Sequence, residues 1–143
     1  MSDLVVLRVV AKLLIPLILL FGLYVQTHGD FGPGGGFQAG VIFASAFILY
    51  ALVFGVANAR RVAPARFMLV LVALGVLIFG GVGVAALLFG GNYLEYAAFA
   101  PEPARGNHIG IWLVELGVGV TVSAVMLTIF LTFAGRGRRD GRP

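Results

Sequence analysis

One acidic residue, Glu115, lies within an apolar run that carries no other charge, and it is the first candidate for chemistry. A carboxylate at membrane depth is costly, so it normally faces protein or water and serves ion or proton transfer. His108 lies seven positions earlier, two helical turns away on the same face, so both side chains can line one path. A structural alternative stays open, in which Glu115 hydrogen-bonds a neighbouring loop at the outer interface and His108 is a capping or contact residue.

The second candidate is a glycine-rich segment, residues 28–40, in which six of thirteen residues are glycine. Its proline fixes one φ angle, whereas its consecutive glycines allow conformations and close approaches that side chains block. Two interpretations stay open: a tight turn whose glycines serve packing, or a site whose N–H groups or carbonyls face an ion or a partner loop. The segment is no phosphate cradle, because no strand precedes it and no lysine follows it.

The residue combinations that enzymes use are missing from the sequence. It has no cysteine and only two histidines, which excludes thiol catalysis, thiolate zinc sites and a histidine-rich metal site within one chain. No P-loop, G-x-S-x-G or H-E-x-x-H motif is present. We therefore predict that the chain is no enzyme and has no catalytic residues, no resident metal and no cofactor.

The elements that must position these residues are membrane-spanning helices. The 143 residues are 60% hydrophobic and 11% charged, whereas a soluble domain carries about 25% charged residues. This composition excludes a water-soluble globule, a disordered chain and a disulfide-stapled scaffold. A span needs about 20 apolar residues. We predict an all-α integral membrane protein, a single membrane domain over residues 1–143, with four transmembrane helices over about 4–26, 37–57, 67–90 and 109–133.

The distribution of basic residues predicts the orientation of these helices. Nine of the ten lysines and arginines fall on one side of the four-span layout, and only Arg105 falls on the other. Because cytoplasmic loops and ends carry the excess of Lys and Arg, both termini are predicted to be cytoplasmic. The net charge of +4 then marks the cytoplasmic helix ends rather than a nucleic-acid surface.

Small residues spaced four apart indicate where helices meet. In lipid, close packing by such residues replaces the hydrophobic effect as the main attraction between helices. The pattern includes Gly36, Gly40 and Ala44, then Ala51 with Gly55, Gly81 with Ala85, Gly117 with Thr121, and Gly119 with Ser123. Two interpretations stay open: these residues close a four-helix monomer, or at least two faces pack against other chains.

The segment His-Gly-Asp-Phe-Gly-Pro-Gly-Gly-Gly-Phe-Gln-Ala-Gly, residues 28–40, resembles the pattern H-G-H-x-x-P-G-G-G-F-x-x-G of a known family. That family is the B subunit (MnhB/MrpB) of Mrp-type multisubunit sodium/proton antiporters, related to subunits of membrane-bound hydrogenases. Residues 108–118 are also similar to the family's D/H-x-G-V-x-L-x-x-x-G-V stretch, and the four-span layout covers nearly the whole chain. The positions that we take as loop and subunit-interface candidates are His28, Asp30, Pro33, Gly34, Gly35, Gly36, Phe37 and Gly40.

Asp30 departs from the family pattern, because it stands where a second histidine is frequent. The departure leaves three roles open for this position: carrying a proton, binding a cation or capping the loop.

The resemblance implies an accessory subunit of a hetero-oligomeric antiporter that exchanges monovalent cations, chiefly sodium, for protons across the bacterial cell (inner) membrane. The implied partners are the other membrane subunits, the lipid bilayer, sodium ions and protons, and no nucleic acid. Glu115 and His108 are then candidates for an ion path or an interface, and the glycine segment for a lock between subunits.

Two alternatives to this function remain. One is a stand-alone small proton-coupled transporter that uses Glu115 and works as an antiparallel dimer. The strong asymmetry of the basic residues argues against it, because a chain that inserts both ways needs a weak bias. The other is a purely structural assembly subunit.

Overall fold

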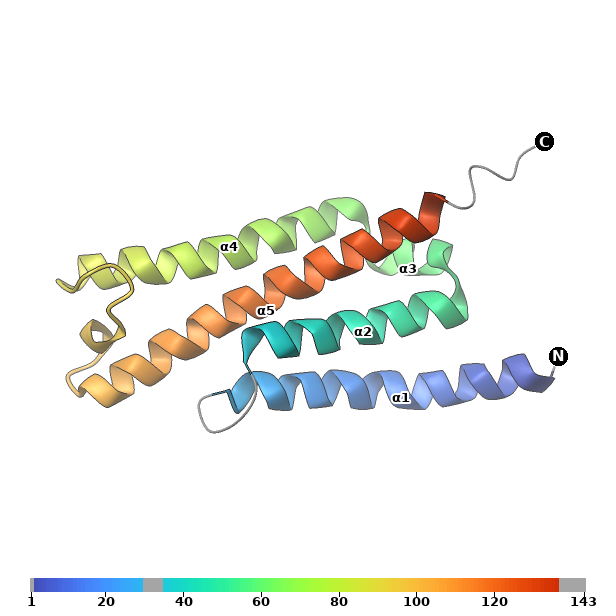
Figure 1. The fold of residues 1–143 in the computed structure, drawn as a ribbon, viewed down its shortest axis with the longest axis horizontal. Helices are drawn as coiled ribbons and strands as arrows, with labels where there is room; N and C mark the ends of the chain where they lie inside the picture. The colour runs from blue at the N-terminus through green and yellow to red at the C-terminus, as the bar shows by residue number, and fades with distance from the viewer. Residues whose placement is uncertain (1, 30–34, 137–143) are drawn as a thin grey trace.

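A computed structural model describes residues 2–29 and 35–136, and in these ranges every regular element is a helix. The elements are α1 (Ser2–Thr27), α2 (Gly36–Phe54), α3 (Val56–Val62), α4 (Ala65–Leu88), the 3-10 helix η1 (Tyr96–Phe99) and α5 (Pro103–Arg136) (Figure 1). Within the described ranges four helices, α1, α2, α4 and α5, are long and apolar enough to cross a membrane. The prediction of an all-α chain with four transmembrane helices is confirmed.

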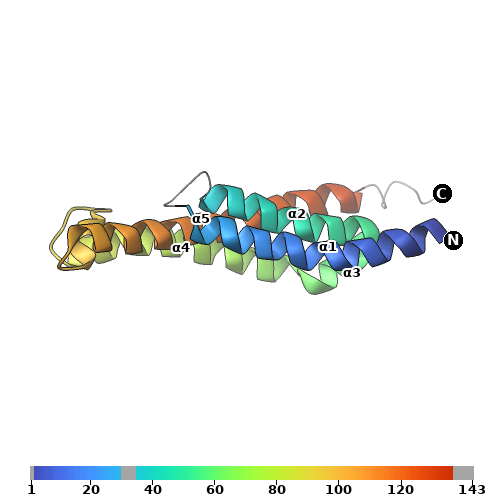
Figure 2. The ribbon, with the colours of Figure 1, turned by 90° about the horizontal axis from the view of Figure 1, so that it is seen from below.

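The four long helices form nearly a single layer, in the spatial order α4, α5, α2 and α1 (Figures 1 and 2). α5 runs obliquely between α4 and α2, and α1 packs mainly on α2 at the edge. Large apolar side chains such as Leu20, Leu69 and Leu77 are exposed along the outer helices. The described residues therefore leave both broad faces of the layer uncovered, and lipid or other proteins must cover them.

Close backbone approach holds α5 between its two neighbours. A Cβ atom at Gly75 of α4 would lie 2.6 Å from the carbonyl oxygen of Gly117 and would collide with the Thr121 hydroxyl. On the opposite side, a Cβ atom at Gly40 of α2 would lie 2.7 Å from the carbonyl oxygen of Gly119. Such distances are too short for carbon and oxygen in van der Waals contact, so these crossings accept only glycine. At these positions the small-residue pattern serves packing within the chain.

A buried apolar cluster joins α2, α3, α4 and α5 near one end of the layer. Its members are Ala51, Ala59, Ala63, Met68, Ala124, Leu127 and Leu131. At the same end, Arg60 of α3 donates from Nη2 to the carbonyl oxygen of Leu131 at 2.9 Å. The ammonium group of Lys12 lies 6.0 Å from the ring centroid of Phe54 and connects α1 to α2.

Two helix ends differ from the boundaries expected from the apolar runs. α2 ends at Phe54 rather than at about 57, because Gly55 has a φ of 98°, which glycine adopts readily, and α3 begins after it. α5 begins at Pro103 rather than at about 109. Proline is favourable in the first turn of a helix, and residues 104–108, which include Arg105, Asn107 and His108, continue the helix beyond its apolar part.

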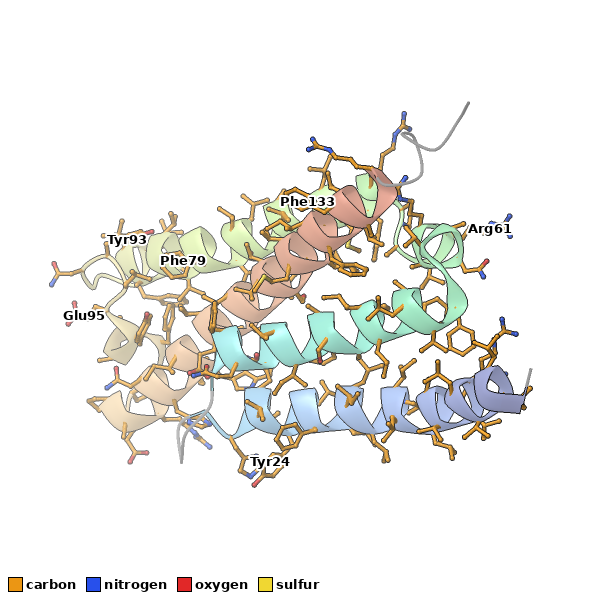
Figure 3. The ribbon with its side chains drawn as sticks, turned by 45° about the vertical axis from the view of Figure 1, so that its right-hand side comes forward. Tyr24, Arg61, Phe79, Tyr93, Glu95 and Phe133 are labelled. Carbon is orange, nitrogen blue, oxygen red and sulfur yellow. The ribbon has the colours of Figure 1, made fainter. Side chains whose placement is uncertain are left out.

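Among the described residues, the basic side chains other than Arg105 lie toward the end of the layer where α1 begins and α5 ends. Arg61 lies there, far from Glu95 and Tyr93 at the opposite end (Figure 3). Arg136 ends α5 at the same end as Arg61, whereas Arg105 lies in the first turns of α5 at the other end. The order of the helices thus brings these basic residues to one end of the layer, as the four-span layout predicted. The cytoplasmic location of that end stays a prediction.

Because the sequence has no cysteine, single substitutions can test this orientation. Asn58 in α3 and Asn92 after α4 are both exposed and lie at opposite ends of the layer. We expect a membrane-impermeant maleimide to label Asn92→Cys in intact cells, and to label Asn58→Cys only after the cells are opened. The reverse pattern would contradict the predicted orientation.

The crossing of α4 and α5 predicts unequal effects of two identical substitutions on one helix. Gly75→Ala forces a Cβ atom against α5, and we expect a loss of about 1–3 kcal/mol in the free energy of unfolding. Gly81→Ala is the matched control, because no described atom lies within 4 Å of its Cβ position. Both changes in the free energy of unfolding are measured on the purified full chain in detergent, with the helical circular dichroism signal as the readout of unfolding. Equal losses would contradict the crossing.

Candidate functional site

The carboxylate of Glu115 lies against both described ends of the connection between α1 and α2. A Cβ atom at Gly29 would lie 2.5 Å from Glu115 Oε2 and 2.9 Å from Oε1. A Cβ atom at Gly35 would lie 3.2 Å from Oε1. The carboxylate therefore occupies space that two missing side chains leave open. The structure brings together the two candidates that the sequence presented separately, the acidic residue and the glycine-rich segment.

The first turn of α2 rests directly on the main chain of α5 at the same point. A Cβ atom at Gly36 would collide with the carbonyl group of Glu115. Gly35 is the N-cap residue of α2, and the first N–H groups of a helix have no partner inside it. Because this end of a helix carries a partial positive charge, it favours a nearby carboxylate.

Glu115 lies well inside α5 rather than near its end. Twelve residues separate it from Pro103, which corresponds to about 18 Å along the axis at 1.5 Å per residue. The apolar run over 109–133 alone would put Glu115 only about one and a half turns from the outer end of the span. Its side chain is half-buried.

His108 does not lie next to the carboxylate. Its side chain is exposed, and seven residues of continuous helix, about 10 Å along the axis, separate it from Glu115. The spacing keeps the two residues on one face of α5, as the sequence indicated. A route between them therefore has to pass through other groups.

The remaining candidates of the connection divide between described and undescribed residues. Asp30, Pro33 and Gly34 lie outside the described residues. His28 is exposed at the end of α1, where its Nδ1 atom lies 3.2 Å from the carbonyl oxygen of Tyr24. The two rings are stacked with centroids 4.2 Å apart, and Tyr24 projects from the outer edge of α1 (Figure 3). His28 therefore caps α1 on the exposed side of the layer.

Two candidates in the first turns of α2 differ in burial. Phe37 is 57% exposed and is available to lipid or a neighbouring subunit. Gly40 is buried against α5 at Gly119, so it serves packing within this chain.

The structure adds a polar residue that the sequence analysis did not select, Gln26 near the end of α1. Its side chain is only 5% exposed, and its Nε2 atom has no hydrogen-bond partner among the described residues. A Cβ atom at Gly119 would lie 2.9 Å from Gln26 Oε1, so the amide reaches α5 one turn beyond Glu115. The signal in the sequence was an amide at the end of an apolar run, since buried amides require partners.

Among the described residues, Glu115 lies against backbone groups rather than in a cluster of ligating side chains. Residues 2–29 and 35–136 contain no group of three or more His, Cys, Asp or Glu that could hold a metal ion. A single carboxylate beside two helix ends can exchange a proton or a monovalent cation, and it can equally fix the connection to α5.

The similarity of this chain to known proteins extends over most of its length. Residues 6–128 match a family described as a domain related to the MnhB subunit of Na+/H+ antiporter. The chain belongs to this family. The match includes α1, α2, the connection between them and the part of α5 that holds Glu115. The resemblance stated from the glycine-rich segment is therefore confirmed. The four long apolar helices indicate that this MnhB-family chain is a multi-pass membrane protein.

Relatives of this MnhB-family chain carry the name antiporter subunit mnhB2. The relative from Staphylococcus aureus (strain Newman) is 37% identical over 134 residues, which cover 92% of this chain and 94% of the relative. The relative from Staphylococcus haemolyticus (strain JCSC1435) is 38% identical over the same length and shares of the two chains. The similarity therefore extends over all four long helices.

The contact between Gly29 and Glu115 predicts that two substitutions will be coupled. Gly29→Ala should lower the free energy of unfolding by about 1–2 kcal/mol, because the new methyl group displaces the carboxylate. Glu115→Asp withdraws the carboxylate by one methylene group, so the double variant should lose at least about 0.5 kcal/mol less than the sum. Unfolding of the full chain in detergent measures all three variants.

The control for this coupling is Gly80→Ala combined with Glu115→Asp. No described atom lies within 4 Å of the Cβ position of Gly80, so the effects of these two substitutions on the free energy of unfolding should add. Additive losses for the Gly29 pair as well would show that the contact is absent.

Proposed function

We propose that this chain is an accessory subunit of a hetero-oligomeric sodium/proton antiporter in the bacterial cell membrane, and that Glu115 contributes to its ion path. The observation that carries the ion-path proposal is the contact of the Glu115 carboxylate with Gly29 and Gly35. Family membership supports the antiporter. Other membrane subunits, sodium ions and protons are the proposed partners.

The electrostatics at Glu115 support exchange of a proton or a cation. Gly29 follows the last turn of α1, where unpaired carbonyl groups carry partial negative charge and favour a cation. Gly35 precedes the first turn of α2, whose N–H groups favour the bare carboxylate. Because the two helix ends act in opposite directions, the carboxylate is suited to both binding and releasing a positive charge.

The flat layer supports a role within a larger complex. The described part of the chain covers neither broad face of the layer, and large apolar side chains are exposed on the outer helices. Small residues on α4 also remain open, since Gly80 and Gly81 have no described atom within 4 Å of their Cβ positions. These surfaces favour neighbouring subunits over a stand-alone transporter, which must enclose its own path.

A purely structural subunit is the second candidate function. It is favoured by the same contact, because a carboxylate held between two helix ends can fix the connection of α1 and α2 to α5 without any ion. The two functions differ in what happens when only the charge of Glu115 is removed.

Glu115→Gln removes the ionisable group and keeps the length of the side chain. In membrane vesicles of the whole complex, we expect sodium/proton antiport to fall by about tenfold or more, while the complex stays assembled. Glu102→Gln is the matched control, because Glu102 is an exposed carboxylate just before α5, and it should leave antiport unchanged.

Affinity purification in mild detergent gives the second half of this test. Unlike membrane subunits should co-purify with both the natural chain and Glu115→Gln. Loss of those subunits in Glu115→Gln would assign Glu115 a structural role, and unchanged antiport would remove it from the ion path. A lone homodimer of the natural chain would contradict the accessory-subunit proposal itself.

A further inference from the structure

A cavity of about 200 Å³ lies between α1, α2 and α5, one to two turns along α5 from Glu115. Apolar side chains, among them Leu23, Phe43 and Val120, form most of its wall. Two polar side chains, those of Gln26 and Ser123, also line it. At about 30 Å³ for each molecule of liquid water, the cavity has room for several waters.

The Gln26 amide needs a partner that the described residues do not supply. Its side chain is 5% exposed, and Nε2 has no hydrogen-bond partner among residues 2–29 and 35–136. An unsatisfied donor buried in this way costs about 1–3 kcal/mol, and lipid tails offer no acceptor. Buried donors without a protein partner normally bond ordered water.

Further polar atoms surround the same space. The Cβ position of Gly119 is 2.9 Å from Gln26 Oε1 and 3.2 Å from the carbonyl oxygen of Gly36. Ser123 Oγ donates to the carbonyl oxygen of Val120 at 3.0 Å, which leaves its lone pairs free to accept a hydrogen bond. A buried water needs two to four polar partners, and the amide of Gln26 and the hydroxyl of Ser123, which both line the cavity, provide them.

The spacing along α5 connects this cavity to the carboxylate. Glu115, Gly119 and Ser123 follow one another at intervals of four, so they lie on one face of the helix. The Gln26 amide meets that face at Gly119, between the carboxylate and the hydroxyl. The carboxylate, the amide and the hydroxyl thus lie along one face over about two turns of α5.

We propose that Gln26 and Ser123 bind water in this cavity, and that this water lies one to two turns along α5 from the carboxylate of Glu115. The chemistry of the cavity points to water as its ligand. Among its lining residues none carries a formal charge that would hold an ion, and an amide with a free donor is unsuited to a lipid tail. The role of this water in supplying protons or hydrated cations to Glu115 rests on the proposed function, whereas its binding does not.

Thiol reactivity tests the water directly, because a thiol reacts as its thiolate and a dry apolar site keeps it protonated. Ser123→Cys places a thiol in the cavity. Ser45→Cys is the matched control. Ser45 also donates to a carbonyl three residues earlier, that of Ile42 at 2.7 Å. It lies on the outer surface of the membrane-spanning helix α2, exposed to what surrounds this chain in the membrane rather than to the cavity. No native cysteine of this chain interferes.

The measurement is the rate at which methanethiosulfonate ethylammonium modifies each variant in the intact complex in membranes, read on this chain after affinity capture. We expect Ser123→Cys to react about tenfold faster than Ser45→Cys. Adding Gln26→Leu, which removes the amide, should slow the reaction at position 123 by about fivefold or more. Should Gln26→Leu fail to co-purify with the other subunits, Gln26→Met replaces it and preserves the length of the side chain.

Two results would overturn the proposal. One is a rate at position 123 no higher than that at position 45, as in a dry cavity or one filled by a partner's side chain. The other is an unchanged rate at position 123 after the amide is removed. The measurement is independent of antiport: reactive Ser123→Cys together with unchanged antiport in Glu115→Gln rejects only the ion-path role of Glu115. Unreactive Ser123→Cys together with lost antiport in Glu115→Gln rejects only the water.

Discussion

The backbone contact of α5 with α2 and α4 is the constraint on which the rest of the structure depends. Burial from water cannot drive association between helices that are already in lipid, so surfaces that fit closely must provide the attraction. Gly40 and Gly75 provide them, because each lets a main-chain carbonyl of α5 approach where a side chain would collide. These two crossings fix the position of α5 along both neighbours, and they thereby determine which residues meet the α1–α2 connection.

Other glycines create the polar environment of the candidate site. Gly29 and Gly35 leave room for the carboxylate of Glu115, and Gly119 leaves room for the amide of Gln26. Larger residues at these positions would push the polar groups away from α5 and toward lipid, where they lack partners. The close approach that glycine allows therefore explains both the packing of the helices and the placement of polar groups at membrane depth.

The sequence was sufficient for the features that depend on composition along the chain. Four apolar runs predicted four helices, and the glycine-rich segment indicated the family. Features that depend on the relative position of distant segments could not be predicted. Spacing selected Gly81 with Ala85 and not Gly75, although of these two glycines only Gly75 meets α5. The contact of Glu115 with Gly29 also depends on how α5 is placed along α1. The apolar run did not indicate the additional helical turns that begin at Pro103.

A flat layer of four helices also limits what this chain can do alone. Glu115 is half-buried, and each helix of the layer has described neighbours only at its sides. A charged or hydrated path at membrane depth must be enclosed by protein or water on every side. Neighbouring subunits must therefore complete the enclosure of any path through Glu115, so this chain supplies one wall and its polar groups. That division explains in physical terms why such a chain works as a subunit rather than as a transporter by itself.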